Sequence, residues 1–149
     1  MKELMNPASA VIESARLLRS LHALFVDGKD EGVDANAIRE DMEQPWYAMT
    51  MAEQDRIDGL SIDLYAIAEG GPPRVDMNPI ELREWQDKAK SAFHRYSQGH
   101  FDETLTFLRQ PAPTFLPAAA VPFLQSRCWE RLGDDETSLV FAREAEKCN

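Results

Sequence analysis

Two stretches of the sequence, QGHFDETL at residues 98–105 and LGDDETSL at residues 132–139, share one pattern at a separation of 34 residues. Each has a glycine at its second position, acidic residues shortly after it and a leucine at its end. Further along, Phe107 matches Phe141 at the same offset. Because similarity at a fixed period is typical of repeated structural units, we expect two copies of one unit in residues 85–149.

The residues around the two stretches predict helices. Asn78 and Pro79 are typical of a helix start, since asparagine caps the first turn and proline needs no donor there. A broad apolar stripe follows up to Gly99, formed by Leu82, Trp85, Ala89, Ala92, Phe93 and Tyr96. We predict a second helix over about 102–109, a proline-rich connector over 111–117 and two more helices after it. No segment alternates convincingly as a strand would, so the predicted fold class is all-α.

The period and the turn glycine resemble those of the tetratricopeptide repeat (TPR), a pair of antiparallel helices of about 34 residues. Ala92 and Ser126 stand where that family packs its helices closely, and Trp129 and Phe101 stand at its aromatic positions. The resemblance covers residues 85–149 and implies helix pairs stacked as a short solenoid. It also implies a protein–protein interaction module, an adaptor or scaffold without catalytic activity.

Several positions depart from the repeat signature. Thr104 and Ser138 replace the usual alanine after the turn, and Asp135 replaces an aromatic residue. Pro122 falls in the opening turn of the second unit, where a missing donor costs little. The alternative is a generic helical bundle in which Gly99 and Gly133 match by chance.

The first part of the chain also predicts helices. Asn6 and Pro7 open an amphipathic stripe that ends at Asp27 and Gly28, where glycine can adopt a left-handed conformation. A shorter helix is expected over about 34–43. Pro45 should end it, because proline disfavours helical geometry in the residue before it.

After that proline, Trp46 and Tyr47 are expected in a connector that anchors against the core. Thr50 and Glu53 then form a capping box that opens another helix. The segment from Trp46 to Tyr65 is similar to a motif of bacterial proteins, although the similarity implies no function.

Residues 70–73, Gly-Gly-Pro-Pro, are the clearest linker in the sequence. We expect a single all-α domain over residues 1–149, with helices in 1–71 and two TPR-like helix pairs in 79–149. Two repeats are fewer than usually fold alone, so the helices before the linker are expected to stack on the first repeat and complete the core.

The net charge of −10 is concentrated in one segment. Residues 27–63 carry eleven acidic and three basic residues, a net charge of −8. This balance argues against nucleic acid as a partner, because phosphate binding needs a basic surface. No run of about 18 apolar residues or secretory signal is present, so we expect a cytoplasmic protein without membrane contact.

No catalytic motif is found in the sequence. Glycine signatures of hydrolases, phosphate loops and dinucleotide folds are missing, and the three histidines are not spaced as ligands on one helix face. His22 follows an apolar stripe and is expected to be a half-buried packing residue. Cys128 and Cys148 match neither a disulfide framework nor a zinc site. We therefore predict no enzyme, no catalytic residues and no cofactor.

The acidic segment provides an alternative function, a metal-binding or hydrolytic domain. The loop that begins at Asp27 resembles a calcium loop in its first aspartate and in Gly32. However, Lys29 stands where a carboxylate ligand is needed, and Ile38 occupies the position of the closing glutamate. Glu40 and its acidic neighbours are surrounded by charged residues, so nothing separates their pKa values as catalysis would require. A solvated helix face without metal is therefore preferred.

The resemblance implies that the first helix of each repeat lines a concave groove that binds an extended peptide or a partner helix. The predicted partner-binding residues are Gln86, Lys90, Phe93, Ser97, Phe123, Arg127, Glu130 and Arg131. Aromatic and cationic side chains together suit an acidic peptide.

The sequence also predicts how the last repeat is covered. The sequence stops after the last predicted helix, and it lacks the polar capping helix that solenoids often add. Leu139 and Ala142 would then lie near an open end. We expect a partner or a second copy of the chain to cover this end, giving a homodimer in the latter case.

Overall fold

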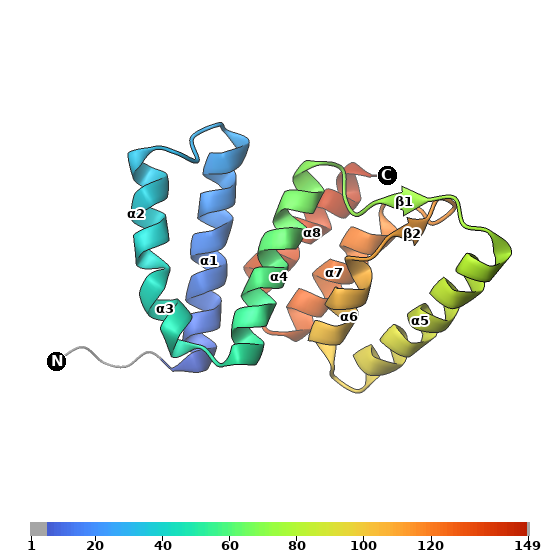
Figure 1. The fold of residues 1–149 in the computed structure, drawn as a ribbon. Helices are drawn as coiled ribbons and strands as arrows, with labels where there is room; N and C mark the ends of the chain where they lie inside the picture. Colours follow the sequence, from blue (N-terminus) through green and yellow to red (C-terminus); the bar gives the residue numbers. More distant parts are fainter. Residues whose placement is uncertain (1–5, 149) are drawn as a thin grey trace. The chain divides into compact units, whose positions relative to one another are not determined.

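The structure is a computed structural model that describes residues 6–148, and most of them are helical (Figure 1). It consists of two compact units, unit 1 up to Ala68 and unit 2 from Glu69. Unit 1 contains α1 (Pro7–Val26), α2 (Val33–Asp41), α3 (Glu43–Ala48) and α4 (Met51–Ala68). Unit 2 contains β1 (Arg74–Val75), α5 (Pro79–Ser97), α6 (Phe101–Leu108), β2 (Ala112–Pro113), α7 (Ala120–Arg131) and α8 (Asp135–Lys147). The predicted all-α class is confirmed, whereas a single domain over residues 1–149 stays a prediction.

In unit 1, α1 contacts each of the other three helices. Its start is the predicted one, because the Asn6 side chain accepts a hydrogen bond from the Ser9 backbone N–H at 2.8 Å. The predicted stop is also found, since Gly28 has a φ of +75°. One face of α1 is buried, formed by Ala10, Val11, Ser14, Ala15, Leu17 and Leu18. Together with Ile57, Leu60 and Leu64 of α4, these side chains form most of the core of the unit.

The connection between α2 and α4 differs from the prediction. Pro45 does not end the shorter helix; it lies in the first turn of α3, where no intrahelical donor is needed. Trp46 and Tyr47 therefore belong to a helix rather than to a connector. The capping box is confirmed: the Glu53 carboxylate accepts from the Thr50 backbone N–H at 3.0 Å, and the Thr50 hydroxyl accepts from the Glu53 N–H at 3.2 Å.

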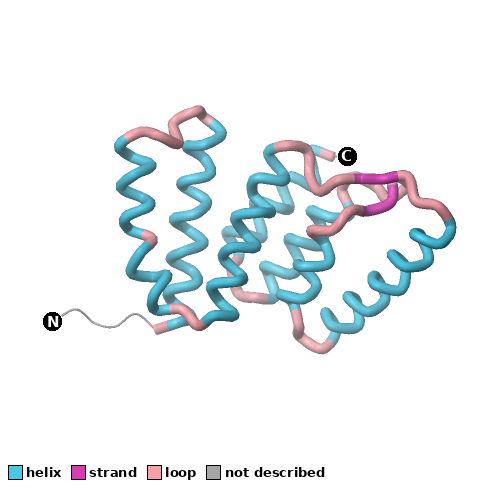
Figure 2. The backbone as a smooth tube through the Cα atoms, in the orientation of Figure 1, coloured by secondary structure: helices cyan, strands magenta, loops and turns pink. Residues whose placement is uncertain are grey.

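In unit 2, Asn78 caps α5 as predicted, and the structure adds a capping box between Asn78 and Glu81. The two strands were not expected, because two residues are too short to show alternation in a sequence. They pair in parallel, Arg74 with Ala112 and Val75 with Pro113, and join the start of the unit to the connector before α7 (Figure 2). The Arg74 guanidinium also donates to the backbone carbonyls of Thr114 and Leu116. We call this arrangement the clasp.

The two turns that are 34 residues apart have the same backbone geometry. Gly99 has a φ of +86° and Gly133 a φ of +87°. After the first turn, His100 N–H donates to the Arg95 carbonyl at 2.9 Å; after the second, Asp134 N–H donates to the Trp129 carbonyl at 3.0 Å. Both are the closing hydrogen bond of a Schellman motif. Each turn thus connects two helices in the same local way.

The matched small residues also lie at matched helix contacts. The Thr104 hydroxyl on α6 donates to the Ala92 carbonyl on α5 at 3.1 Å. At the same offset, the hydroxyls of Ser138 on α8 and Ser126 on α7 are 2.9 Å apart. In unit 2, α5 contacts α6 and α7 contacts α8, whereas the TPR-like stacking of these pairs stays a prediction. Among residues 6–148, no helix is long and apolar enough to cross a membrane.

Candidate groove on α5 and α7

The side chains predicted to bind a partner are all exposed. Four project from α5 (Gln86, Lys90, Phe93 and Ser97) and four from α7 or its end (Phe123, Arg127, Glu130 and Arg131). The two phenylalanines are unusual in this respect, because Phe93 is 49% and Phe123 is 54% exposed. Large aromatic side chains that lie open to water at helical spacing are candidates for binding.

Three of these residues line one cleft between α5 and α7. Phe93, Phe123 and Arg127 surround a space of about 210 Å³, together with Tyr96, Thr104, Leu124 and Cys128. Its surface is largely apolar, with the Arg127 guanidinium as the one charged group among the lining side chains. We call this space the groove. Gln86, Lys90, Ser97, Glu130 and Arg131 are exposed but do not line it.

The cations near the groove are not neutralised by other side chains of the described residues. In residues 6–148, neither Arg127 nor Lys90 forms an ion pair. By contrast, the Arg95 guanidinium pairs with Glu103 and so joins α5 to α6. An arginine beside aromatic rings and without a carboxylate partner can bind a carboxylate of a ligand by charge-assisted hydrogen bonds.

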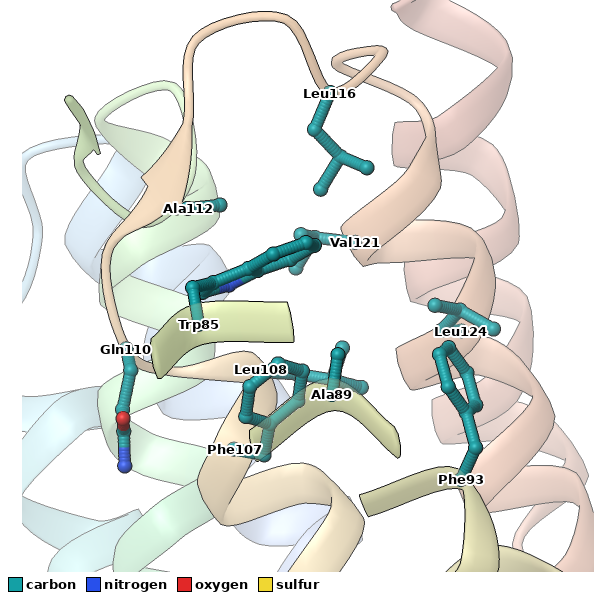
Figure 3. Close-up of a pocket in the computed structure, with 10 residues that line it drawn as sticks. All are labelled: Trp85, Ala89, Phe93, Phe107, Leu108, Gln110, Ala112, Leu116, Val121 and Leu124. Carbon is teal, nitrogen blue, oxygen red and sulfur yellow. The ribbon is translucent and has the colours of Figure 1, made fainter. Parts of the chain in front are cut away.

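A second cavity adjoins the groove, and it was not predicted from the sequence. Figure 3 shows it around the indole of Trp85, with Phe107 below and Leu116, Val121 and Leu124 on the other sides. Phe93 and Leu124 line both this cavity and the groove. Gln110 is its one polar lining side chain, and its amide points away from the Trp85 ring (Figure 3). We call this space the Trp85 cavity.

The size of the Trp85 cavity limits what it could accept. Its volume is about 110 Å³, and a cavity of roughly 150 Å³ holds a benzene ring. An aliphatic side chain therefore fits better than an aromatic one. The broad apolar stripe on α5 was a signal for this cavity, because the stripe is wider than the surface that one neighbouring helix would cover. The side chains from the connector and from α7 could not be placed from the sequence.

The other predicted sites have simple structural roles. His22 is half-buried, as predicted; its ring stacks on Phe25 and meets Tyr65 edge-on. Burial lowers the pKa of His22, because it disfavours the charged imidazolium. Cys128 is buried and Cys148 is exposed, and neither forms a disulfide bond within residues 6–148. Within residues 6–148, no three His, Cys, Asp or Glu side chains are grouped to hold a metal ion.

Comparisons with known proteins do not identify the chain: no family model, no curated protein and no solved structure matches it.

Proposed function

We propose that unit 2 is a non-catalytic protein–protein interaction module, an adaptor with TPR-like helix pairs that binds a peptide or a partner helix in the groove. The observation that carries this proposal is the meeting of Phe93, Phe123 and Arg127 in one cleft. Aromatic rings supply apolar contact area, and arginine supplies a charge; both residue types dominate binding energy at protein interfaces.

The repeat interpretation rests on separate observations. The turns at Gly99 and Gly133 share their φ angles, and the hydroxyl contacts at Thr104 and Ser138 fall at the same positions of their helices. Two helix pairs of the same local geometry are the basic unit of a helical repeat protein.

The charge of the groove favours an acidic partner. Arg127 lies in the groove, and Lys90 lies on the exposed side of α5, both without an ion pair in the described residues. The Trp85 cavity beside the groove has room for one aliphatic side chain of the same partner. A peptide with an aliphatic residue near an acidic one would use both spaces.

The test selects peptides from a random library on the full chain and then measures their affinity for variants. We expect Arg127→Ala to weaken binding of a selected acidic peptide about tenfold or more, because a desolvated charge pair is lost. Phe93→Ser should have a similar effect, and Lys90→Ala a smaller one. Arg83→Ala changes an exposed arginine of α5 outside the groove and serves as the control.

Selected peptides that bind the Arg127→Ala and Phe93→Ser variants as tightly as the original chain would contradict the proposal. The alternative, metal binding by the acidic segment over residues 27–63, is tested by calorimetric titration with calcium. Heat of binding at micromolar calcium would favour that alternative.

A further inference from the structure

Unit 1 contains a cleft that the groove in unit 2 does not involve. All four helices of the unit contribute to it: Ser14 from α1, Arg39 from α2, Glu43, Trp46 and Tyr47 from α3, and Ile57 from α4. Its volume is about 340 Å³. Small-molecule sites in proteins usually measure roughly 300–1,000 Å³ and combine apolar walls with a few polar groups. We call this space the Ser14 cleft.

The serine that lines this cleft is buried without a partner. Ser14 is 2% exposed, and its hydroxyl forms no hydrogen bond within residues 6–148. A serine in a helix can satisfy its hydroxyl by donating a hydrogen bond to the backbone carbonyl four residues earlier. Ser20 of the same helix does so, since its hydroxyl donates to the Arg16 carbonyl at 3.1 Å. Leaving a buried hydroxyl unpaired is unfavourable, so a ligand group that formed a hydrogen bond with the Ser14 hydroxyl would remove this cost.

The walls of the cleft suit a flat aromatic molecule. Trp46 is half-buried and Tyr47 is 76% exposed, so both offer ring surface to the space beside them. The wall at Trp46 is held in place, because the Gln54 side-chain amide on α4 donates to the Trp46 carbonyl at 2.9 Å. Aromatic side chains of this kind favour stacked or edge-on contacts with aromatic ligands.

The charges that line the cleft favour a neutral ligand. Arg39 and Glu43 contribute one charge of each sign, so neither an anion nor a cation is selected. The Arg39 side chain is moreover held by other groups, since it donates to the Asp30 carbonyl at 2.7 Å and to the Asn36 side chain at 3.1 Å.

We propose that the Ser14 cleft binds a small, neutral, aromatic molecule whose single hydrogen-bonding group pairs with the Ser14 hydroxyl. The Trp46 and Tyr47 rings contact the aromatic body, and the hydrogen bond to Ser14 fixes its orientation. The site does not depend on peptide binding by unit 2, because it is formed wholly by residues of unit 1.

The test uses two probes that differ in one hydroxyl group, 2-naphthol and naphthalene, with the full chain. Binding is followed by the indole N–H signal of Trp46 in nitrogen-edited NMR spectra, assigned with the Trp46→Phe variant. We expect both probes to shift this signal and 2-naphthol to bind about fivefold more tightly, the effect of one net hydrogen bond. Ser14→Ala should reduce this ratio to about one while naphthalene still binds.

Two further variants make the outcome decisive. Ser20→Ala removes a hydroxyl that already has a partner outside the cleft, and it should leave the fivefold ratio unchanged. Ser14→Cys keeps the size of the side chain with a weaker donor and should give an intermediate ratio. The proposal is overturned if neither probe shifts the Trp46 signal, or if the preference for 2-naphthol survives in Ser14→Ala.

Discussion

At the scale of single residues, small side chains hold each helix pair of unit 2 together. Ser126 and Ser138 are both buried, and their hydroxyls bond to each other across α7 and α8. Thr104 has the matched role toward Ala92 on α5. The resemblance to the TPR family implied close packing at Ala92 and Ser126, whereas Thr104 and Ser138 departed from the repeat signature. The sequence did not predict the hydrogen bonds, because these depend on how the two helices are rotated toward each other.

The Ser126–Ser138 pair leads to a test by paired substitutions. Ser138→Ala leaves the Ser126 hydroxyl buried without its partner, so we expect it to lower the free energy of unfolding by about 1–2 kcal/mol. Adding Ser126→Ala removes the orphaned hydroxyl and should recover part of that loss. Urea unfolding measures each variant, with Ser91→Ala on the exposed face of α5 as the control. Simple additivity of the two substitutions would show that the hydroxyls do not interact.

At the scale of elements, most helices could be predicted from local signals, whereas the clasp could not. Capping residues such as Asn78 and Thr50 lie within four positions of the groups that they bind, so a sequence pattern reveals them. The clasp joins Arg74 to residues 40 and 42 positions later. A periodic pattern within a short stretch of sequence gives no information about such a distant contact. The Trp85 cavity was missed for the same reason, since Ala112 and Leu116 reach it from the connector that the clasp holds.

The clasp can be tested by removing its arginine. Arg74→Met keeps an unbranched apolar chain in place of the arginine stem. It loses the guanidinium that donates to the Thr114 and Leu116 carbonyls. Hydrogen bonds from a charged group contribute roughly 1.5–3 kcal/mol each when shielded and less at an exposed site. We therefore expect the amides of Ala112 and Thr114, which donate to Pro73 and Val75, to exchange with solvent about tenfold faster.

Hydrogen exchange measured by NMR provides this comparison residue by residue. Arg83→Met removes an exposed arginine of α5 that has no part in the clasp, and it should leave both amides unchanged. The amide of Gly99, at the opposite end of α5, is an internal reference. Unchanged exchange of Ala112 in Arg74→Met would mean that backbone pairing alone holds the strands.

At the scale of the whole molecule, the helical class followed from the sequence because apolar periodicity is a local property repeated along the chain. The groove was predicted from the resemblance to the TPR family, and the structure adds the Trp85 cavity and the Ser14 cleft. The Ser14 cleft is lined by side chains from four helices, and its key residue is a serine within an apolar stripe. A serine at such a position gives no sign in the sequence of whether its hydroxyl is paired.

Self-association is the prediction that concerns the whole molecule. Leu139 on α8 is 51% exposed, unlike its repeat counterpart Leu105, which is 1% exposed. We propose that this surface forms a homodimer or is covered by a partner. Light scattering over a range of concentrations should show a rise in mass for the original chain, and Leu139→Glu should remain monomeric. Val33→Glu, at a residue 85% exposed in unit 1, is the matched control. A monomer at every concentration would contradict homodimer formation.

The clasp has a consequence for the order in which the chain folds. It closes a loop of about 40 residues that contains α5 and α6, and closing a loop of that length costs conformational entropy. The two helices and the turn at Gly99 involve only near neighbours, so we expect them to form before the strands pair. We therefore expect the Trp85 cavity to be completed late in folding. A side chain that enters the Trp85 cavity would act late in folding, by preventing the contacts of the clasp from reopening.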